Sequence, residues 1–162
     1  MILSTANAIR PFIPLIATVT EEISETFQIY KDVEYNKKIC NSLMDRVEMA
    51  DLAIRILKRR KQENETNFRN QEYYRVFLRF VDVMKEIRSF ILDVSQIQGY
   101  LKYDKGSVKD KFNSITMKFE EVMVDLNFTM TVANEEQRRL DQESLNEDIE
   151  QMQHVFKKFI FT

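Results

Sequence analysis

The sequence predicts an all-α fold, an up-down four-helix bundle followed by a C-terminal brace helix. Only two glycines and two prolines occur among the 162 residues, which leaves little turn chemistry for a sheet of many strands. Apolar residues also recur at alternating three- and four-residue steps along most of the chain, as on the buried face of amphipathic helices. A chain of this length can form a single domain around one core.

The clearest helix is predicted between Tyr73 and Val94. Its apolar stripe contains positions 77, 80, 84, 87, 91 and 94, and charged residues occupy the opposite side. Asn67 or Asn70 can cap its N-terminus. An amphipathic helix of six turns is not stable alone in water, so other helices must cover its stripe.

Two helices are predicted before it. The first begins near Pro11 and Pro14, with a break in front of it, because proline is tolerated only near a helix start. The second carries its stripe from Ile39 to Leu57 and ends in a basic run, a favourable position for cations.

Two helices are also predicted after it. Gly99 and Gly106 bracket the clearest loop of the sequence, and Ser107 is expected to cap the fourth helix. A fifth helix is expected from Asn134, where two glutamates follow in the first turn. The predicted units are therefore a bundle over 1–133, with an N-terminal segment 1–10, and a brace helix with its tail over 134–162. The residues expected to hold the brace against the bundle are Leu145, Ile149, Met152, Phe156 and Phe159.

The residues give no support to an enzyme. His154 is the only histidine, so a di-metal site of the kind found in helical bundles is not expected, and no cofactor is predicted. Cys40 is the only cysteine, which excludes an intrachain disulfide and fits a reducing compartment. The formal net charge of −2 argues against nucleic-acid binding.

Two features could carry function. The apolar residues near the N-terminus could enter a membrane interface, or they could be core. The residues expected to insert are Ile2, Leu3, Ile9, Phe12 and Ile13. Basic residues of the second helix could bind anionic lipid headgroups, or they could form a solvated helix end. The residues expected to contact headgroups are Lys37, Lys38, Lys58, Arg59, Arg60 and Lys61.

Several segments resemble a known family. They are ANAIRPFIPLIATV, YKDVEYNKKICNSLMDRV, SQIQGYLKYDKGSVKDKFNSITMKFEEVMVDLNF and DLNFTMTVANEEQRRLDQESLNEDI. Their order resembles the HeLo-like N-terminal four-helix bundles of the mixed-lineage kinase domain-like family, where a similar Lys-Lys-x-Cys turn occurs. The chain looks most similar to such domains in kinase-like proteins of arbuscular mycorrhizal fungi. The resemblance covers roughly residues 7–150.

This resemblance implies a cell-death effector domain of the necroptosis type. Such a bundle is restrained by its brace helix, then forms homo-oligomers and permeabilises the plasma membrane through acidic phospholipids. The resemblance also implies that Arg46, on the second helix, contacts lipid headgroups. It implies a cytoplasmic protein that is recruited to the plasma membrane, with a kinase-like domain as a candidate partner. The alternative is a non-lytic helical oligomerisation or adaptor module that regulates such a domain. The acidic residues Glu21, Glu22 and Glu25 of the first helix favour the alternative.

Overall fold

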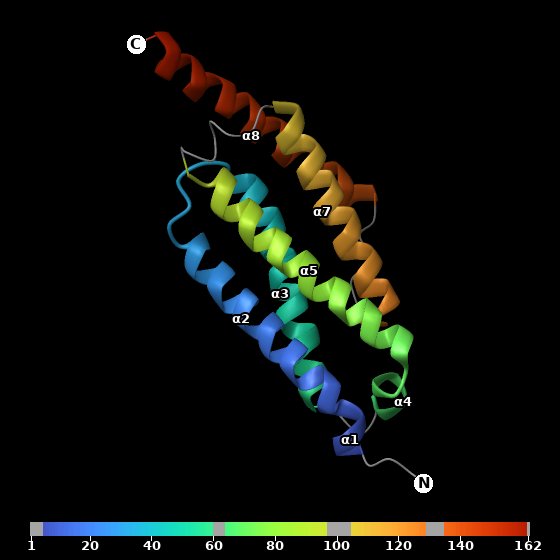
Figure 1. Cartoon of the computed structure of the whole chain (residues 1–162). Helices are drawn as coiled ribbons and strands as arrows, with labels where there is room; N and C mark the ends of the chain where they lie inside the picture. Colours follow the sequence, from blue (N-terminus) through green and yellow to red (C-terminus); the bar gives the residue numbers. More distant parts are fainter. Residues whose placement is uncertain (1–4, 60–63, 97–104, 129–134, 162) are drawn as a thin grey trace.

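A computed structural model describes residues 5–59, 64–96, 105–128 and 135–161 (Figure 1). Within these ranges the regular structure is helical throughout, with no strand, so the all-α prediction is confirmed. The helices are α1 (Thr5–Ile9), the 3-10 helix η1 (Arg10–Phe12), α2 (Ile13–Tyr30), α3 (Lys37–Arg59), α4 (Glu65–Phe68), α5 (Gln71–Val94), α7 (Lys105–Asp125) and α8 (Glu135–Phe161).

The two prolines lie at helix starts, as predicted. Pro11 is in the first positions of η1, and Pro14 is in the first turn of α2, where a missing backbone N–H costs no helical hydrogen bond. The short α1 and η1 therefore form the predicted break before the first long helix. Phe12 packs against four neighbouring rings, those of Phe68, Tyr74, Phe77 and Tyr73, with ring centroids 5.1, 5.4, 5.7 and 5.8 Å away.

The central helix is α5. The Asn70 side chain caps it by accepting hydrogen bonds from the backbone N–H of Glu72 at 2.8 Å and of Tyr73 at 3.4 Å. All six residues of the predicted stripe are buried: Phe77, Phe80, Met84, Ile87, Ile91 and Val94. Helices α2 and α7 pack along α5, and α3 packs along α2 (Figure 1).

Helix α7 differs from the prediction at its start. It already includes Lys105, so Gly106 and Ser107 lie inside its first turn, and the prediction that Ser107 caps the helix is wrong. Its end is a Schellman motif, with Asn127 in the left-handed conformation at φ 57°. There the N–H of Asn127 donates to Val124 and that of Phe128 donates to Met123.

Helix α8 packs against α3 and contributes to the same core as the other helices. Its apolar residues Leu145, Ile149 and Met152 are buried. The predicted boundary between residues 133 and 134 lies outside the described residues, as do the side chains of Phe156 and Phe159.

Candidate functional site

The predicted headgroup-binding cations are distributed along α3. Lys37 and Lys38 are exposed at its first turn, and Lys58 and Arg59 are exposed at its last turn. A helix of 23 residues is roughly 34 Å long, so these pairs lie at opposite ends and cannot contact one headgroup. Arg60 and Lys61 lie outside the described residues.

Arg46 requires a correction. It was predicted to contact lipid headgroups, but its side chain is only 5% exposed and lies between α3, α7 and α8. Its Nη2 lies 2.6 Å from Asp141 Oδ2 and 3.9 Å from Glu120 Oε1. Ser42 Oγ donates to the other oxygen of Asp141. This guanidinium is occupied by a buried carboxylate and is not available to lipid in this conformation.

A second aspartate of α8 caps the start of α3. Asp148 Oδ2 accepts a hydrogen bond of 2.6 Å from the backbone N–H of Ile39, one of the N–H groups that a helix start leaves without an intrahelical partner. Asn36, just before α3, has a φ of 57° and uses its side chain differently, with Nδ2 donating to the Val94 carbonyl at 2.7 Å. The cap of α3 therefore comes from α8 rather than from the residue before the helix.

We call this set the α3–α8 polar contact; its members are Lys38, Ile39, Ser42 and Arg46 of α3 with Asp141, Glu147 and Asp148 of α8. Lys38 pairs with Glu147 at its exposed edge. Burial raises the pKa of the Asp148 carboxyl, and this outweighs the lowering effect of the Ile39 N–H and of Lys38. Buried charges of this kind are tolerated only where partners satisfy them, which makes the docking of α8 specific to this site.

Cys40 lies beside this contact. The residue is fully buried, and burial together with the nearby Asp148 charge raises the pKa of its thiol to about 12. The thiolate is the reactive form of cysteine, so the Cys40 thiol is unreactive in this folded state.

The predicted membrane-inserting residues also require a correction. Ile9 and Phe12 are buried, Phe12 with only 1% of its surface exposed, because the rings of α4 and α5 enclose it. Ile13 is 55% exposed. Ile2 and Leu3 lie outside the described residues. In this conformation Ile9 and Phe12 cannot contact lipid.

An exposed strip on the second half of α3 was missed by the sequence reasoning. Leu52 and Ile56 are 60% and 40% exposed, and the exposed side chains of Arg55 and Arg59 lie on the same side of the helix at three- and four-residue steps. We call Leu52, Arg55, Ile56 and Arg59 the α3 outer strip. The sequence signal was available, since two large apolar residues four apart occur on the polar side of an otherwise regular stripe.

This strip lies at the end of the molecule that carries α1. Lys58 Nζ donates to Thr20 Oγ1 of α2 at 3.2 Å, and Ile13 precedes Thr20 by two turns towards α1. The exposed Ile13 and the basic end of α3 therefore lie at the same end of the helical bundle. Of the acidic residues on α2, Glu22 and Glu25 both lie against Arg88 of α5, which reduces the acidity that α2 presents.

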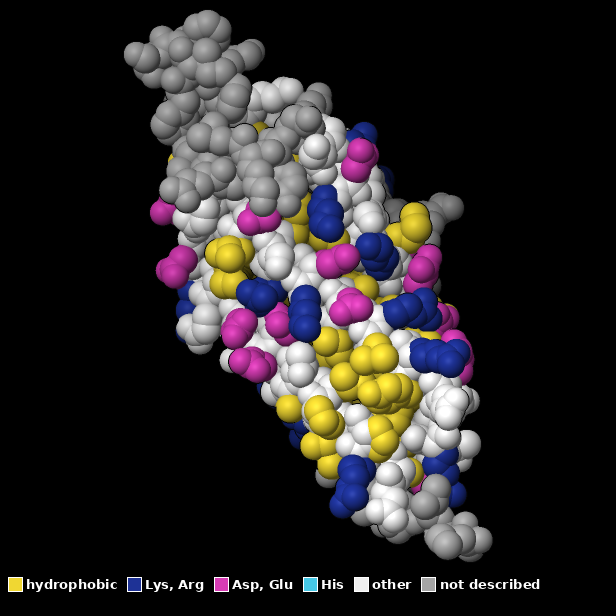
Figure 2. All heavy atoms as spheres, in the orientation of Figure 1, with side chains coloured by type: hydrophobic (Ala, Val, Ile, Leu, Met, Phe, Trp, Pro, Cys, Tyr) yellow, Lys and Arg dark blue, Asp and Glu magenta, His cyan; other side chains and the backbone are white. Residues whose placement is uncertain are grey.

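Apolar side chains also gather on the face formed by α2 and α5, on the half nearer α1 (Figure 2). The large apolar residues that are exposed or half-buried in that half of α2 and α5 are Ile13, Leu15, Tyr74 and Leu78. Lys and Arg side chains lie around this region and are interleaved with Asp and Glu further along the face (Figure 2).

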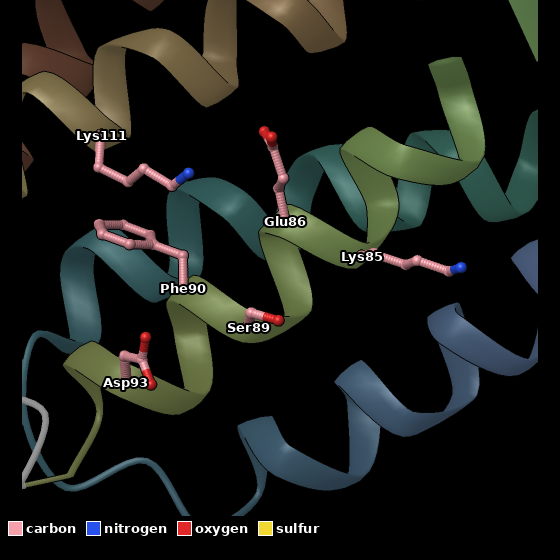
Figure 3. A pocket seen from close by; sticks show the side chains of 6 residues that line it. All are labelled: Lys85, Glu86, Ser89, Phe90, Asp93 and Lys111. Atoms are coloured by element: carbon pink, nitrogen blue, oxygen red, sulfur yellow. The ribbon is translucent and has the colours of Figure 1, made fainter. Parts of the chain in front are cut away.

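A small surface hollow lies between α5 and α7 (Figure 3). Phe90 forms its floor, and Lys111 of α7 extends over it towards Glu86 (Figure 3). The other residues that line it are Lys85, Ser89 and Asp93. Its two cations are balanced by two carboxylates, so the hollow has no charge preference for an anionic headgroup.

Among the described residues no helix combines the length and the apolar character needed to cross a bilayer. The same residues contain no group of three His, Cys, Asp or Glu side chains arranged to hold a metal ion.

Comparison of the chain with protein-family models, with curated proteins and with solved structures gave no match.

Proposed function

We propose that this chain is a cell-death effector domain of the HeLo-like type, which binds anionic phospholipid membranes, oligomerises on them and permeabilises them. In this proposal α2, α3, α5 and α7 are the four helices of an up-down bundle, and α8 is the brace that restrains it. The protein would reside in the cytoplasm, be recruited to the plasma membrane, and act with a kinase-like domain. The proposal rests on the resemblance of the sequence segments and on the α3 outer strip.

The α3 outer strip is the observation that carries the membrane proposal. It combines apolar and cationic side chains on one exposed helical face, the composition of a helix that lies in a membrane interface. Cations near an anionic membrane each contribute about 1 kcal/mol of binding free energy. Lys58 and Ile13 are exposed at the same end of the molecule as this strip.

The α3–α8 polar contact supports the restraint by α8. It holds α8 against the first half of α3 through hydrogen bonds and an ion pair between buried side chains, which oppose partial detachment of α8. Because Ile9 and Phe12 are buried in this state, any insertion of the N-terminal segment requires a conformational change.

The test is binding of the 162-residue protein to vesicles of neutral lipid with and without phosphatidylinositol phosphate, together with dye release. A variant with Arg55, Lys58 and Arg59 changed to Glu should lose most recruitment to the anionic vesicles. A control with Arg75, Lys85 and Lys109 changed to Glu has the same net charge, and these exposed cations lie on α5 and α7. Equal binding by both variants would refute the assignment of this surface.

A second candidate is the non-lytic interaction module. The burial of Arg46, Ile9 and Phe12 favours it, because three of the residues expected to contact lipid are unavailable in this conformation. Absence of dye release from a folded protein that still self-associates would select this candidate.

A further inference from the structure

The exposed face of α3 has an ordered arrangement of charge. From Asp45 onwards the outward positions lie on one side of the helix, and they are acidic in the middle of the helix, mainly apolar next, and cationic at the end. They are Asp45, Glu48, Leu52, Arg55, Ile56 and Arg59. All six are exposed, whereas the neighbouring Arg46 and Val47 are covered by other helices.

This order is self-complementary. If two copies of α3 lie antiparallel about a two-fold axis at Leu52, Asp45 of one copy lies opposite Arg59 of the other, and Glu48 lies opposite Ile56, beside Arg55. We propose that this face binds a second copy of the chain in such an antiparallel contact. Each residue pair then occurs twice, as an isologous interface requires. Opposite charges at both ends and apolar side chains in the centre would set its register.

The geometry limits how strong this dimer can be. Residues 45–59 span roughly 21 Å of helix, and the charged pairs at both ends stay within reach only at a small crossing angle of about 20°. One helix face buries well below the roughly 1,200 Å² of a standard interface, so the dissociation constant should be on the order of 10–100 μM. Arg55 also pairs with Asp51 of its own helix at 3.0 Å, which weakens its contribution to the contact.

Such a dimer would regulate membrane binding, a consequence that rests on the proposed function. The contact covers Leu52, Ile56 and Arg59, the side chains that we propose to meet the membrane. Dimer and membrane-bound forms are then alternatives, and the strip is hidden at high protein concentration until the dimer dissociates.

The test of the dimer is sedimentation equilibrium of the full chain, without lipid, across its expected dissociation constant. Asp45→Arg and Arg59→Asp should each weaken dimerisation about tenfold or more, because each places like charges opposite each other twice. The double variant Asp45→Arg/Arg59→Asp restores both pairs with reversed sign and should dimerise again. Asp82→Arg, an exposed reversal on α5, is the matched control and should dimerise like wild type.

Two results would overturn the proposal. One is a wild-type chain that stays monomeric throughout the concentration range. The other is a dimer that all four variants leave unchanged, since the contact would then lie elsewhere. Circular dichroism spectra and thermal melts of the variants separate lost contact from lost fold, and all changed side chains are exposed.

The regulatory consequence is tested separately with anionic vesicles. Asp45→Arg keeps the strip and should bind vesicles better than wild type at concentrations where wild type is dimeric. The matched control for the added charge is again Asp82→Arg. Equal binding by these two variants would refute masking of the strip. A wild type that dimerises as predicted but never binds vesicles would leave the dimer standing and refute the proposed membrane function.

Discussion

Arg46 and Asp141 form the pair of residues on which the docking of α8 depends most. Their charged atoms are 2.6 Å apart, and both side chains are nearly inaccessible to water. Removal of one partner from a buried ion pair leaves the other charge desolvated, which costs far more than the pair itself contributes. Exposed pairs in this protein, such as Arg79 with Asp125 at 3.1 Å, lack this property.

Arg46→Ala should lower the free energy of unfolding by about 3–5 kcal/mol, because Asp141 stays buried without its cation. Arg79→Ala, the control, should lower it by about 1 kcal/mol or less. Urea unfolding followed by circular dichroism measures both. If Arg46→Ala cost no more than Arg79→Ala, the contact would be open to water in solution.

Asp148 should make stability depend on pH. Burial raises the pKa of its carboxyl above the ordinary 3.8, so the folded state binds more protons than the unfolded state between these two pKa values. Its contribution is fully present below pH 3.8 and is lost as the pH rises through the folded-state pKa. Asp148→Asn keeps an oxygen for the Ile39 N–H and cannot ionise, so its stability relative to wild type should rise with pH through this window.

Urea unfolding of both proteins at a series of pH values measures this difference. Asp148→Ala is the comparison variant, and it should be less stable than Asp148→Asn at every pH because Ile39 loses its acceptor. The opposite result would be a wild type whose stability rises relative to Asp148→Asn as the pH rises. It would show that Lys38 and the backbone N–H groups stabilise the ionised carboxylate by more than burial destabilises it.

At the scale of the elements, α8 and α3 depend on each other. Asp148 caps the first turn of α3, and the buried side chains of Leu145 and Ile149 anchor the same part of α8 in the core. Detachment of α8 therefore leaves the start of α3 without its cap, and Cys40 lies within this part of α3. The single thiol of the chain therefore reports loosening of this helix start.

Asp148→Ala should speed labelling of Cys40 by a thiol reagent at neutral pH by about fivefold or more, because a lost cap costs roughly 1 kcal/mol of helix stability. Glu150→Ala, an exposed carboxylate on the same helix, is the control and should label like wild type. Absorbance of the released thiol product follows the rate. Equal rates for the two variants would show that Cys40 becomes accessible by an opening that does not involve α8.

At the scale of the whole molecule, a formal net charge of −2 hides an uneven distribution. The last turn of α3 is cationic. The middle of α3 is acidic, and so is the part of α8 that packs against α3. A charge average would have argued against an anionic membrane, but interactions at surfaces depend on local charge within about 10 Å. The same local arrangement supports both the membrane proposal and the dimer, and the Asp45 and Arg59 variants distinguish them.

The sequence by itself determined the helices. Apolar spacing located the long helices, and Asn70 was among the two asparagines proposed to cap α5, because helix period and caps depend on neighbours a few residues away. The start of α7 was misplaced, since Gly106 and Ser107 favour a loop locally but are carried by a helix anchored at Val108 and Phe112 in the core.

Only the tertiary structure decided which side chains are accessible. Arg46 lies on the apolar stripe of α3, and Asp141 and Asp148 lie seven residues apart on the apolar stripe of α8. This pattern could have indicated that the three side chains are buried with partners, but it could not identify the partners. Phe12 and Leu52 are both large and apolar, yet one is buried and the other exposed. Burial depends on which helix covers a face, and that contact joins residues far apart in the sequence.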